Sequence, residues 1–294
     1  MTSSNPSSRF PLASVSDSGG RRCGFVALVG RPNAGKSTLF NALVGQRLSI
    51  VTPKPQTTRD RIVGILTRPD SQVIFLDTPG LLEPQDKLHE RMERQIETAC
   101  HQADVALLLV DATRPRDRMP LVHAFLAANR APLVTALNKI DQVEPARLAG
   151  LRDGLTRELG IVRLLAISAQ RGDGLEELLA AVIGLLPVGP QLFPDDMVAE
   201  QPERFFVAEL IREAAGNQLD EELPYALSVT IEAFRDEEAP RKTYIAAAIH
   251  VERDSQKGIV IGHQGARLRA IGSQARQQVE ALLDRPVFLD LRVK

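Results

Sequence analysis

The chain has 294 residues, of which 44% are hydrophobic and 25% charged, values typical of a globular protein with about two domains. Its 36 Lys and Arg residues nearly balance 37 Asp and Glu residues, so the net charge of −1 by itself predicts no class of partner. Two cysteines exclude a disulfide scaffold and a four-thiolate zinc site. Because no secretory signal and no membrane-length apolar run is visible, we expect a cytoplasmic protein.

The first 20 residues are rich in Ser, Gly and Pro and predict a disordered tail. A transit peptide is the alternative, although the single Arg of this segment argues against it. Over residues 21–186, near-continuous Val, Leu and Ile runs alternate with helical patterns. They predict an α/β domain with a mostly parallel six-stranded sheet and helices on both faces. The run RIVGILT (61–67) follows a long loop and is the candidate for an antiparallel edge strand.

Residues 187–202 carry four prolines and three acids without periodicity, which predicts an interdomain linker. After it, a helix near 204–217 precedes two strands. A Gly-rich turn, a helix near 266–282 and a last strand follow. This order, α-β-β-α-β, predicts a small α+β domain over residues 203–294.

The segment GRPNAGKS (30–37) matches the pattern G-x-x-x-x-G-K-[ST]. It follows a predicted strand and opens a predicted helix, which is the context of a phosphate-binding loop. Its glycines let successive backbone N–H groups face the phosphates. Lys36 can then reach the β- and γ-phosphates, while the Ser37 hydroxyl binds Mg²⁺.

Two further motifs end the third and fifth apolar runs. In DTPG (77–80), Asp77 would lie beside a phosphate-bound Mg²⁺, and Gly80 would offer its N–H to the γ-phosphate. In NKID (138–141), the Asp141 carboxylate matches guanine N1–H and the 2-amino group, which adenine lacks. Such matching rejects the wrong base by roughly 10⁴-fold or more.

Ser168 and Ala169 close the sixth run, where they would support the base from its other edge. The four motifs together predict a site for GTP or GDP with Mg²⁺. The expected nucleotide-binding residues are Gly30, Arg31, Pro32, Asn33, Ala34, Gly35, Lys36, Ser37, Thr38, Asp77, Thr78, Pro79, Gly80, Asn138, Lys139, Asp141, Ser168 and Ala169.

With these motifs and QTTRD (56–60), the N-terminal part resembles the translation-factor-related GTPases, and most closely their Era subgroup. The resemblance implies that residues 21–186 form an α/β P-loop GTPase (G) domain, with a first switch loop over residues 46–60. In this loop Thr57 or Thr58, with Thr58 favoured, completes the Mg²⁺ shell only when the γ-phosphate is present. The expected metal ligands are Ser37, Thr57, Thr58 and Asp77.

Leu81 stands where Ras-like GTPases place the glutamine that orients water. An arginine finger in trans would supply roughly 10³ to 10⁵ in rate, so we expect slow basal GTP hydrolysis without one. In related GTPases an Asn at the position of Asn33 helps to hold a K⁺ ion that replaces the finger; the alternative is that Asn33 merely caps or turns the loop. The candidate catalytic residues are Lys36, Thr58, Asp77, Gly80 and Asn33.

In the C-terminal part, GHQG (262–265) forms a G-x-x-G turn between helical segments, with strands in the order of a type II KH domain. Such a turn brings backbone close to about four nucleotides. Residues 241–294 hold ten Lys and Arg against five acids, although a plain helix-turn-helix with a solvated basic face is the alternative. The expected RNA-binding residues are Gly262, His263, Gln264, Gly265, Arg267, Arg269 and Arg276.

A GTPase joined to a KH domain is the architecture of the Era subgroup, so the resemblance covers residues 23–294. It implies a molecular switch that hydrolyses GTP, binds small-subunit (16S-type) ribosomal RNA and assists assembly of the small ribosomal subunit. We expect a monomer with a weak peripheral fraction at the inner face of the cell membrane.

Two alternative functions are less well supported by the sequence. A membrane-associated regulatory GTPase would bind anionic lipid with its basic C-terminal face, but no amphipathic helix with large apolar anchors is visible. A tRNA-modifying enzyme would need a nucleophile or metal cluster that the motifs do not supply. The sequence departs from the family in two places. The turn carries His263 and Gln264 where the family generally has a basic residue, which predicts either a weaker phosphate contact or one that depends on protonation of His263. The sequence also ends at Lys294, where relatives usually continue into a helical tail.

Overall fold

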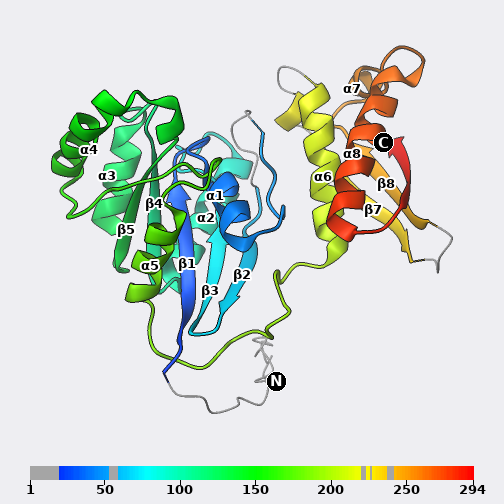
Figure 1. The fold of residues 1–294 in the computed structure, drawn as a ribbon. Helices are drawn as coiled ribbons and strands as arrows, with labels where there is room; N and C mark the ends of the chain where they lie inside the picture. Colours follow the sequence, from blue (N-terminus) through cyan, green and yellow to red (C-terminus); the bar gives the residue numbers. More distant parts are fainter. Residues whose placement is uncertain (1–19, 53–58, 220–222, 226, 237–241) are drawn as a thin grey trace, which may run out of the picture.

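The computed structural model describes residues 20–52, 59–219, 223–225, 227–236 and 242–294. It contains a six-stranded sheet in the order β2-β3-β1-β4-β5-β6 and a three-stranded sheet in the order β7-β8-β9 (Figure 1). Almost all of the expected N-terminal tail, and both Thr57 and Thr58, lie outside the described residues.

The large sheet consists of β1 (Arg22–Gly30), β2 (Ile62–Arg68), β3 (Ser71–Asp77), β4 (Val105–Asp111), β5 (Leu133–Asn138) and β6 (Leu165–Ala166). All of its pairings are parallel except that of β2 with β3 at the edge, which confirms the expectation for RIVGILT. The physical reason is the connection. Only Pro69 and Asp70 separate the paired residues Arg68 and Ser71, and a two-residue turn joins antiparallel strands only.

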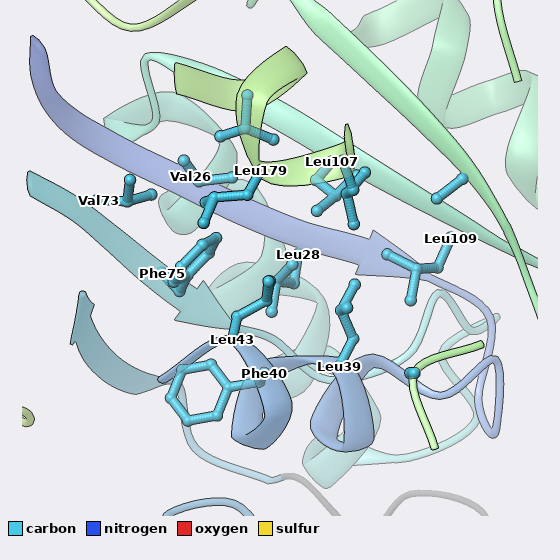
Figure 2. Packing of buried hydrophobic residues seen from close by; sticks show 14 of the residues in the cluster. Val26, Leu28, Leu39, Phe40, Leu43, Val73, Phe75, Leu107, Leu109 and Leu179 are labelled. Carbon is cyan, nitrogen blue, oxygen red and sulfur yellow. The ribbon is translucent and has the colours of Figure 1, made fainter. Parts of the chain in front are cut away.

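The helices that cover this sheet are α1 (Lys36–Val44), α2 (Lys87–Gln102), α3 (Met119–Ala128), α4 (Pro145–Leu159) and α5 (Leu175–Leu185). Successive side chains of a strand point to opposite faces of the sheet, and the helices lie on both faces. Leu28 packs in one core cluster with α1 and α5, whereas Val29 packs in another with Ala99 of α2. Figure 2 shows side chains of α1 facing Leu28 and Phe75 of the sheet. Both faces are therefore buried, which explains the continuous apolar runs in the sequence.

The expected linker, residues 187–202, packs along the first sheet in the structure. The backbone N–H of Ile65 donates to the carbonyl of Val198 at 2.9 Å. The Gln72 side chain donates to the carbonyl of Phe193 at 2.8 Å and accepts from its N–H at 3.0 Å. Prolines remove donors from an extended segment but leave its carbonyls free to accept such bonds.

The second sheet consists of β7 (Ser228–Arg235), β8 (Thr243–His250) and β9 (Val287–Val293), with β7 antiparallel and β9 parallel to β8. Helices α6 (Glu203–Gln218) and α8 (Ala266–Leu283) contribute to the core against it. The expected order α-β-β-α-β did not count the helical segment before the G-x-x-G turn as an element of its own, and the structure forms the short helix α7 (Asp254–Ile261) there. None of the helices described is long and apolar enough to cross a bilayer.

Candidate functional site

The phosphate-binding loop joins the carboxyl end of β1 to α1. Gly35 has φ 95°, and a Cβ there would lie 2.2 Å from Nδ2 of Asn138, so this position requires glycine. The Nζ of Lys36 donates to the carbonyls of Gly30 and Arg31, each at 3.1 Å, so the loop curls around this ammonium group. Burial lowers the pKa of Lys36 to about 8, against the opposing effect of Asp77. An anionic phosphate beside it would favour the charged form.

The Mg²⁺ ligands expected from the motifs lie side by side. The Oγ of Ser37 donates to Oδ2 of Asp77 at 2.8 Å. A hydroxyl and a carboxylate fit Mg²⁺, which takes oxygen ligands and shares its shell with phosphates and water. Among the described residues no cluster of three or more His, Cys, Asp or Glu side chains is present. The hydroxyl of Ser37 and the carboxylate of Asp77 fit the ion by their chemistry.

Ser49 is a neighbour of this metal position that the motifs did not reveal. Its Oγ donates to the same Asp77 oxygen at 2.6 Å. The side chain of Asn41 in α1 holds the backbone there, because its Oδ1 accepts from the N–H of Leu48 at 3.0 Å and of Ser49 at 2.8 Å. Ser49 belongs to no spaced motif, so the only signal in the sequence is its place within the expected switch loop.

The DTPG loop packs directly on the phosphate-binding loop. A Cβ on Gly80 would lie 2.6 Å from the backbone nitrogen of Pro32, so no side chain fits there. The hydroxyl of Thr78 donates to the carbonyl of Leu28 at 2.7 Å, and the N–H of Leu81 to that of Gly30 at 2.9 Å. These bonds place the Gly80 backbone against the loop that holds the phosphates.

Asn138 ties together three loops of the base site. Its Nδ2 donates to the carbonyl of Ala34 at 2.9 Å, and its Oδ1 accepts from the N–H of Ala169 at 2.9 Å. Ser168 Oγ donates to Oδ1 of Asp141 at 2.7 Å, which orients the carboxylate expected to select guanine. The NKID and Ser168–Ala169 segments thus meet the phosphate-binding loop at one edge of the sheet.

Lys139 pairs with an acid that the motif analysis did not include. Its Nζ lies 2.7 Å from Oδ2 of Asp111, the last residue of β4. Burial raises the pKa of Asp111, but hydrogen bonds from Lys139 and Thr113 outweigh it and hold the pKa below its usual value. Asp111 ends a buried strand at the same edge as the motifs, which was the available signal.

The side chain of Arg31 does not reach toward the site. Its guanidinium pairs with the Asp117 carboxylate at 3.0 Å and donates to the carbonyl of Arg114. Only the backbone of Arg31 therefore belongs to the phosphate-binding loop. Asn33 is exposed at the tip of that loop with φ 61°, a conformation that asparagine tolerates well.

The second site is an open groove of about 570 Å³ between α8 and β9. The G-x-x-G turn stands at one end of it, with Gly262, Gln264 and Gly265 at φ 71°, 49° and 75°. The groove is lined by Gln264, Gly265, Leu268, Arg269, Gly272, Ser273, Arg276, Leu289 and Leu291. An apolar floor edged by two guanidinium groups suits bases and phosphates of a single strand.

The structure brings some of the expected RNA-binding residues together and not others. Arg269 and Arg276 are seven residues apart and share a face of α8 on the groove. Arg267 points elsewhere and donates to the carbonyl of Ile259 at 2.8 Å. His263 and Gly262 are likewise absent from the lining of this groove, although both belong to its turn.

Two family models match the chain. Residues 25–139 match the model described as a 50S ribosome-binding GTPase, and residues 222–294 match the KH domain. The GTPase Era of Geotalea uraniireducens is 43% identical over 274 residues, covering 93% of this chain and 92% of its own length. The GTPase Era of a Nocardioides species is 45% identical over 285 residues, at 93% and 91%.

Two solved structures share the fold over most of both chains. One is Era in complex with MgGDPNP and nucleotides 1506–1542 of 16S ribosomal RNA, with a TM-score of 0.88, 40% identity and 93% of each chain covered. The other is a point variant of Aquifex aeolicus Era bound to GDP·AlF4⁻, with a TM-score of 0.87 at the same identity and coverage.

Proposed function

This chain belongs to the Era family of GTPases, and from that membership we propose that it binds small-subunit (16S-type) ribosomal RNA and assists small-subunit assembly while hydrolysing GTP to GDP. One observation supports the proposal above all: the same chain carries the converging loops expected of a guanine-nucleotide site and a groove, lined by Arg269 and Arg276, that has a G-x-x-G turn at one end. The proposed work is cytoplasmic, because ribosomes are assembled there, and the chain acts as a monomer.

In the nucleotide site, Lys36 holds the β- and γ-phosphates and the Gly80 N–H binds the γ-phosphate. Ser37 and Asp77 hold Mg²⁺, which neutralises phosphate charge when bound. Ser49 keeps the Asp77 carboxylate oriented through its 2.6 Å hydrogen bond. Asp141 selects guanine, with Asn138 and Ala169 fixing the loops around the base. The proposed role of Thr58 concerns a residue outside the described part of the chain.

Leu81 follows the DTPG loop, at the position from which Ras-like GTPases orient the attacking water. The Leu81 side chain packs against the apolar cluster of β1, β3 and α2, so it does not orient a water molecule. The exposed position of Asn33 on the loop leaves its side chain accessible from solvent. A monovalent cation held there would neutralise charge that develops during phosphoryl transfer.

We therefore expect GTP hydrolysis to be faster in KCl than in NaCl at equal ionic strength. A rise on the order of tenfold corresponds to about 1.4 kcal/mol of transition-state stabilisation. Phosphate release under multiple-turnover conditions is the measurement. The Asn33→Gly variant, which keeps the positive φ and removes the amide, should lose the preference for K⁺. Equal hydrolysis rates in the two salts would contradict the K⁺ proposal and would mean that Asn33 only turns the loop.

In the RNA groove, the open space beside Gly265 leaves room for a phosphate to approach the backbone. A Cβ on Gly265 meets no atom within 4 Å, whereas one on Gly262 would lie 2.7 Å from the Cβ of Arg267. Substitution at Gly262 therefore disturbs the turn itself, but substitution at Gly265 mainly fills the space left for RNA. Gly265 is the sharper test, although its φ of 75° adds some backbone strain.

We expect Gly265→Asp to weaken RNA binding by roughly 10- to 100-fold, because one added carboxylate opposes a phosphate contact. GTP hydrolysis without RNA should be unchanged. Binding of a labelled RNA from the 3′ end of the small-subunit RNA measures the effect, with Gly150→Asp as the control, since it adds the same charge on α4 where no atom lies within 4 Å of the new Cβ. Equal losses in both variants would contradict the assignment.

Cross-linking followed by sequencing of the bound RNA, with GDP and with a non-hydrolysable GTP analogue, tests the proposed function directly. Enrichment of small-subunit RNA near its 3′ end is the expected result. Recovery of no specific RNA, together with tight binding to anionic vesicles, would instead support the membrane-associated alternative. Any membrane fraction of the protein is expected to be weak and peripheral.

A further inference from the structure

The three-stranded sheet has one face packed on helices and one face that no described helix covers. Along β8, Ile245, Ala247 and Ile249 point into the core with α6 and α8. Since side chains alternate along a strand, Tyr244 and His250 belong to the opposite face. Figure 1 shows α6 and α8 on one side of this sheet.

A ladder of three side chains crosses that open face. The register pairs Arg235 of β7 with Tyr244 of β8, and Tyr244 with Phe288 of β9. The guanidinium carbon of Arg235 lies 5.7 Å from the centroid of the Tyr244 ring. On the other side of Tyr244, the ring of Phe288 stacks at a centroid distance of 6.0 Å and an interplanar angle of 13°. Stacked aromatic rings beside a cation are a usual base-stacking surface.

Phe288 ends the ladder at an open position. Its side chain is 57% exposed, which is unusual for a phenylalanine, and β9 is an edge strand. A planar group can therefore reach the Phe288 ring and continue the stack.

The charges of this face suit an anionic strand. Arg235, Arg292 and Lys294 supply three cations, against the carboxylates of Glu232 and Asp290 among the residues described there. Both acids are engaged, Glu232 with Lys294 and Asp290 with Arg292 at 3.4 Å. The Tyr244 hydroxyl also donates to Asp290 at 3.2 Å, which holds the ring of Tyr244 in place.

This open face is continuous with the RNA groove through a single strand. Leu289 and Leu291 of β9 line the groove, whereas Phe288 and Arg292 of the same strand belong to the open face. Neighbouring residues of a strand are only about 3.3 Å apart along its axis. RNA that leaves the groove over the edge of β9 therefore reaches the face that carries the Phe288 ring.

We propose that Arg235, Tyr244 and Phe288 form a second RNA contact, in which an unpaired base flanking the groove-bound nucleotides stacks on Phe288. This inference rests on the proposed RNA-binding function and extends it to a surface outside the G-x-x-G groove. The flanking phosphates lie near Arg292 and Lys294. The ligand is single-stranded RNA longer than the groove alone can hold.

Two labelled oligonucleotides from the cross-linked region test the proposal, one of about four nucleotides that fills the groove and one of about ten that extends beyond both ends. Phe288→Ala should weaken binding of the longer RNA by about 5- to 100-fold, since removing one stacking partner has an effect of this size. Binding of the shorter RNA should change less than twofold.

Two conservative variants separate stacking from loss of fold. Phe288→Leu keeps an apolar side chain and should lose as much affinity as Phe288→Ala, whereas Phe288→Trp should bind as tightly as the original protein. Because the chain has no other tryptophan, the emission of the Phe288→Trp variant should be quenched by the longer RNA and not by the shorter one. Thermal unfolding of each variant checks that the domain is intact.

The outcomes distinguish this inference from the proposed function. If the original protein binds both RNAs and all Phe288 variants bind them equally well, the second contact is wrong and the groove assignment stands. Equal loss of both RNAs in Phe288→Ala would mean that Phe288 acts through the fold, which also overturns the proposal. If the original protein binds neither RNA, the RNA-binding function itself fails.

Discussion

Asp141→Asn is expected to lower the preference for guanine nucleotides over adenine nucleotides by roughly 10⁴-fold. The carboxylate offers two acceptors to N1–H and the 2-amino group of guanine, whereas an amide offers one acceptor and turns a donor toward the base. The Ser168 bond to Oδ1 at 2.7 Å can persist with Asn, because the amide oxygen still accepts it. The fold should therefore be retained while specificity is lost.

Competition calorimetry with GDP, ADP and XDP measures this change. Xanthine carries a carbonyl in place of the 2-amino group and accepts the hydrogen bond that Asn would donate, so XDP should gain affinity as GDP loses it. Asp153→Asn on α4, which makes the same change of charge at an exposed position, is the control and should leave all three affinities unchanged. Unaltered GDP preference in Asp141→Asn would exclude Asp141 as the selecting residue.

Gly35→Ala should abolish nucleotide binding, with a loss of at least about 10³-fold in GDP affinity. The new Cβ would lie 2.2 Å from Nδ2 of Asn138 and would break the 2.9 Å bond from that amide to the Ala34 carbonyl. The φ of 95° adds strain for any residue with a Cβ. One methyl group would thus displace both the phosphate-binding loop and the loop that holds the base.

The matched control is Gly154→Ala in α4, where a Cβ meets nothing within 4 Å. Alanine in a helix stabilises it by up to about 1 kcal/mol relative to glycine, so this variant should bind GDP normally and unfold at the same or a higher temperature. Binding is measured by calorimetry and stability by thermal unfolding. Normal GDP affinity in Gly35→Ala would show that the close contact with Asn138 relaxes without consequence.

Contacts between the two halves join the switch region to the RNA-binding half. Arg59, the fourth residue of the QTTRD segment, donates to the carbonyl of Leu227 at 2.7 Å and of Pro224 at 3.1 Å. Burial, followed by the charge of Arg212, lowers the pKa of Arg59 to about 10, so the guanidinium stays protonated in these bonds at neutral pH. The end of the expected switch loop is thus attached to the segment before β7.

A second contact lies between the end of α1 and α6. Arg47 pairs with Glu213, whose pKa is raised by burial and lowered by Arg47, with burial prevailing. Neither Arg47 nor Glu213 belongs to a spaced sequence motif, so the sequence did not predict that these two residues meet. Pairs separated by more than 160 positions depend on how the two halves pack, which periodicity and composition do not report.

The sequence alone determined the order of elements in the first half and the identity of the nucleotide. Parallel strands buried on both faces must be continuous apolar runs, and their carboxyl ends meet at one edge, so GRPNAGKS, DTPG and NKID had to converge there. Guanine selectivity could be predicted from the hydrogen-bonding chemistry of the Asp141 carboxylate alone. The antiparallel pairing of β2 with β3 could also be predicted, because the short turn between them permits no other pairing.

Only the tertiary structure decided which side chains complete these sites. It placed Ser49 on Asp77, Lys139 on Asp111, and the side chain of Arg31 away from the phosphates. It also put Arg269 and Arg276 in the groove while Arg267 turned to Ile259, and it stacked Tyr244 on Phe288. The reason is that each of these contacts depends on strand order, helix rotation or register, quantities set by packing of the whole chain rather than by any local pattern.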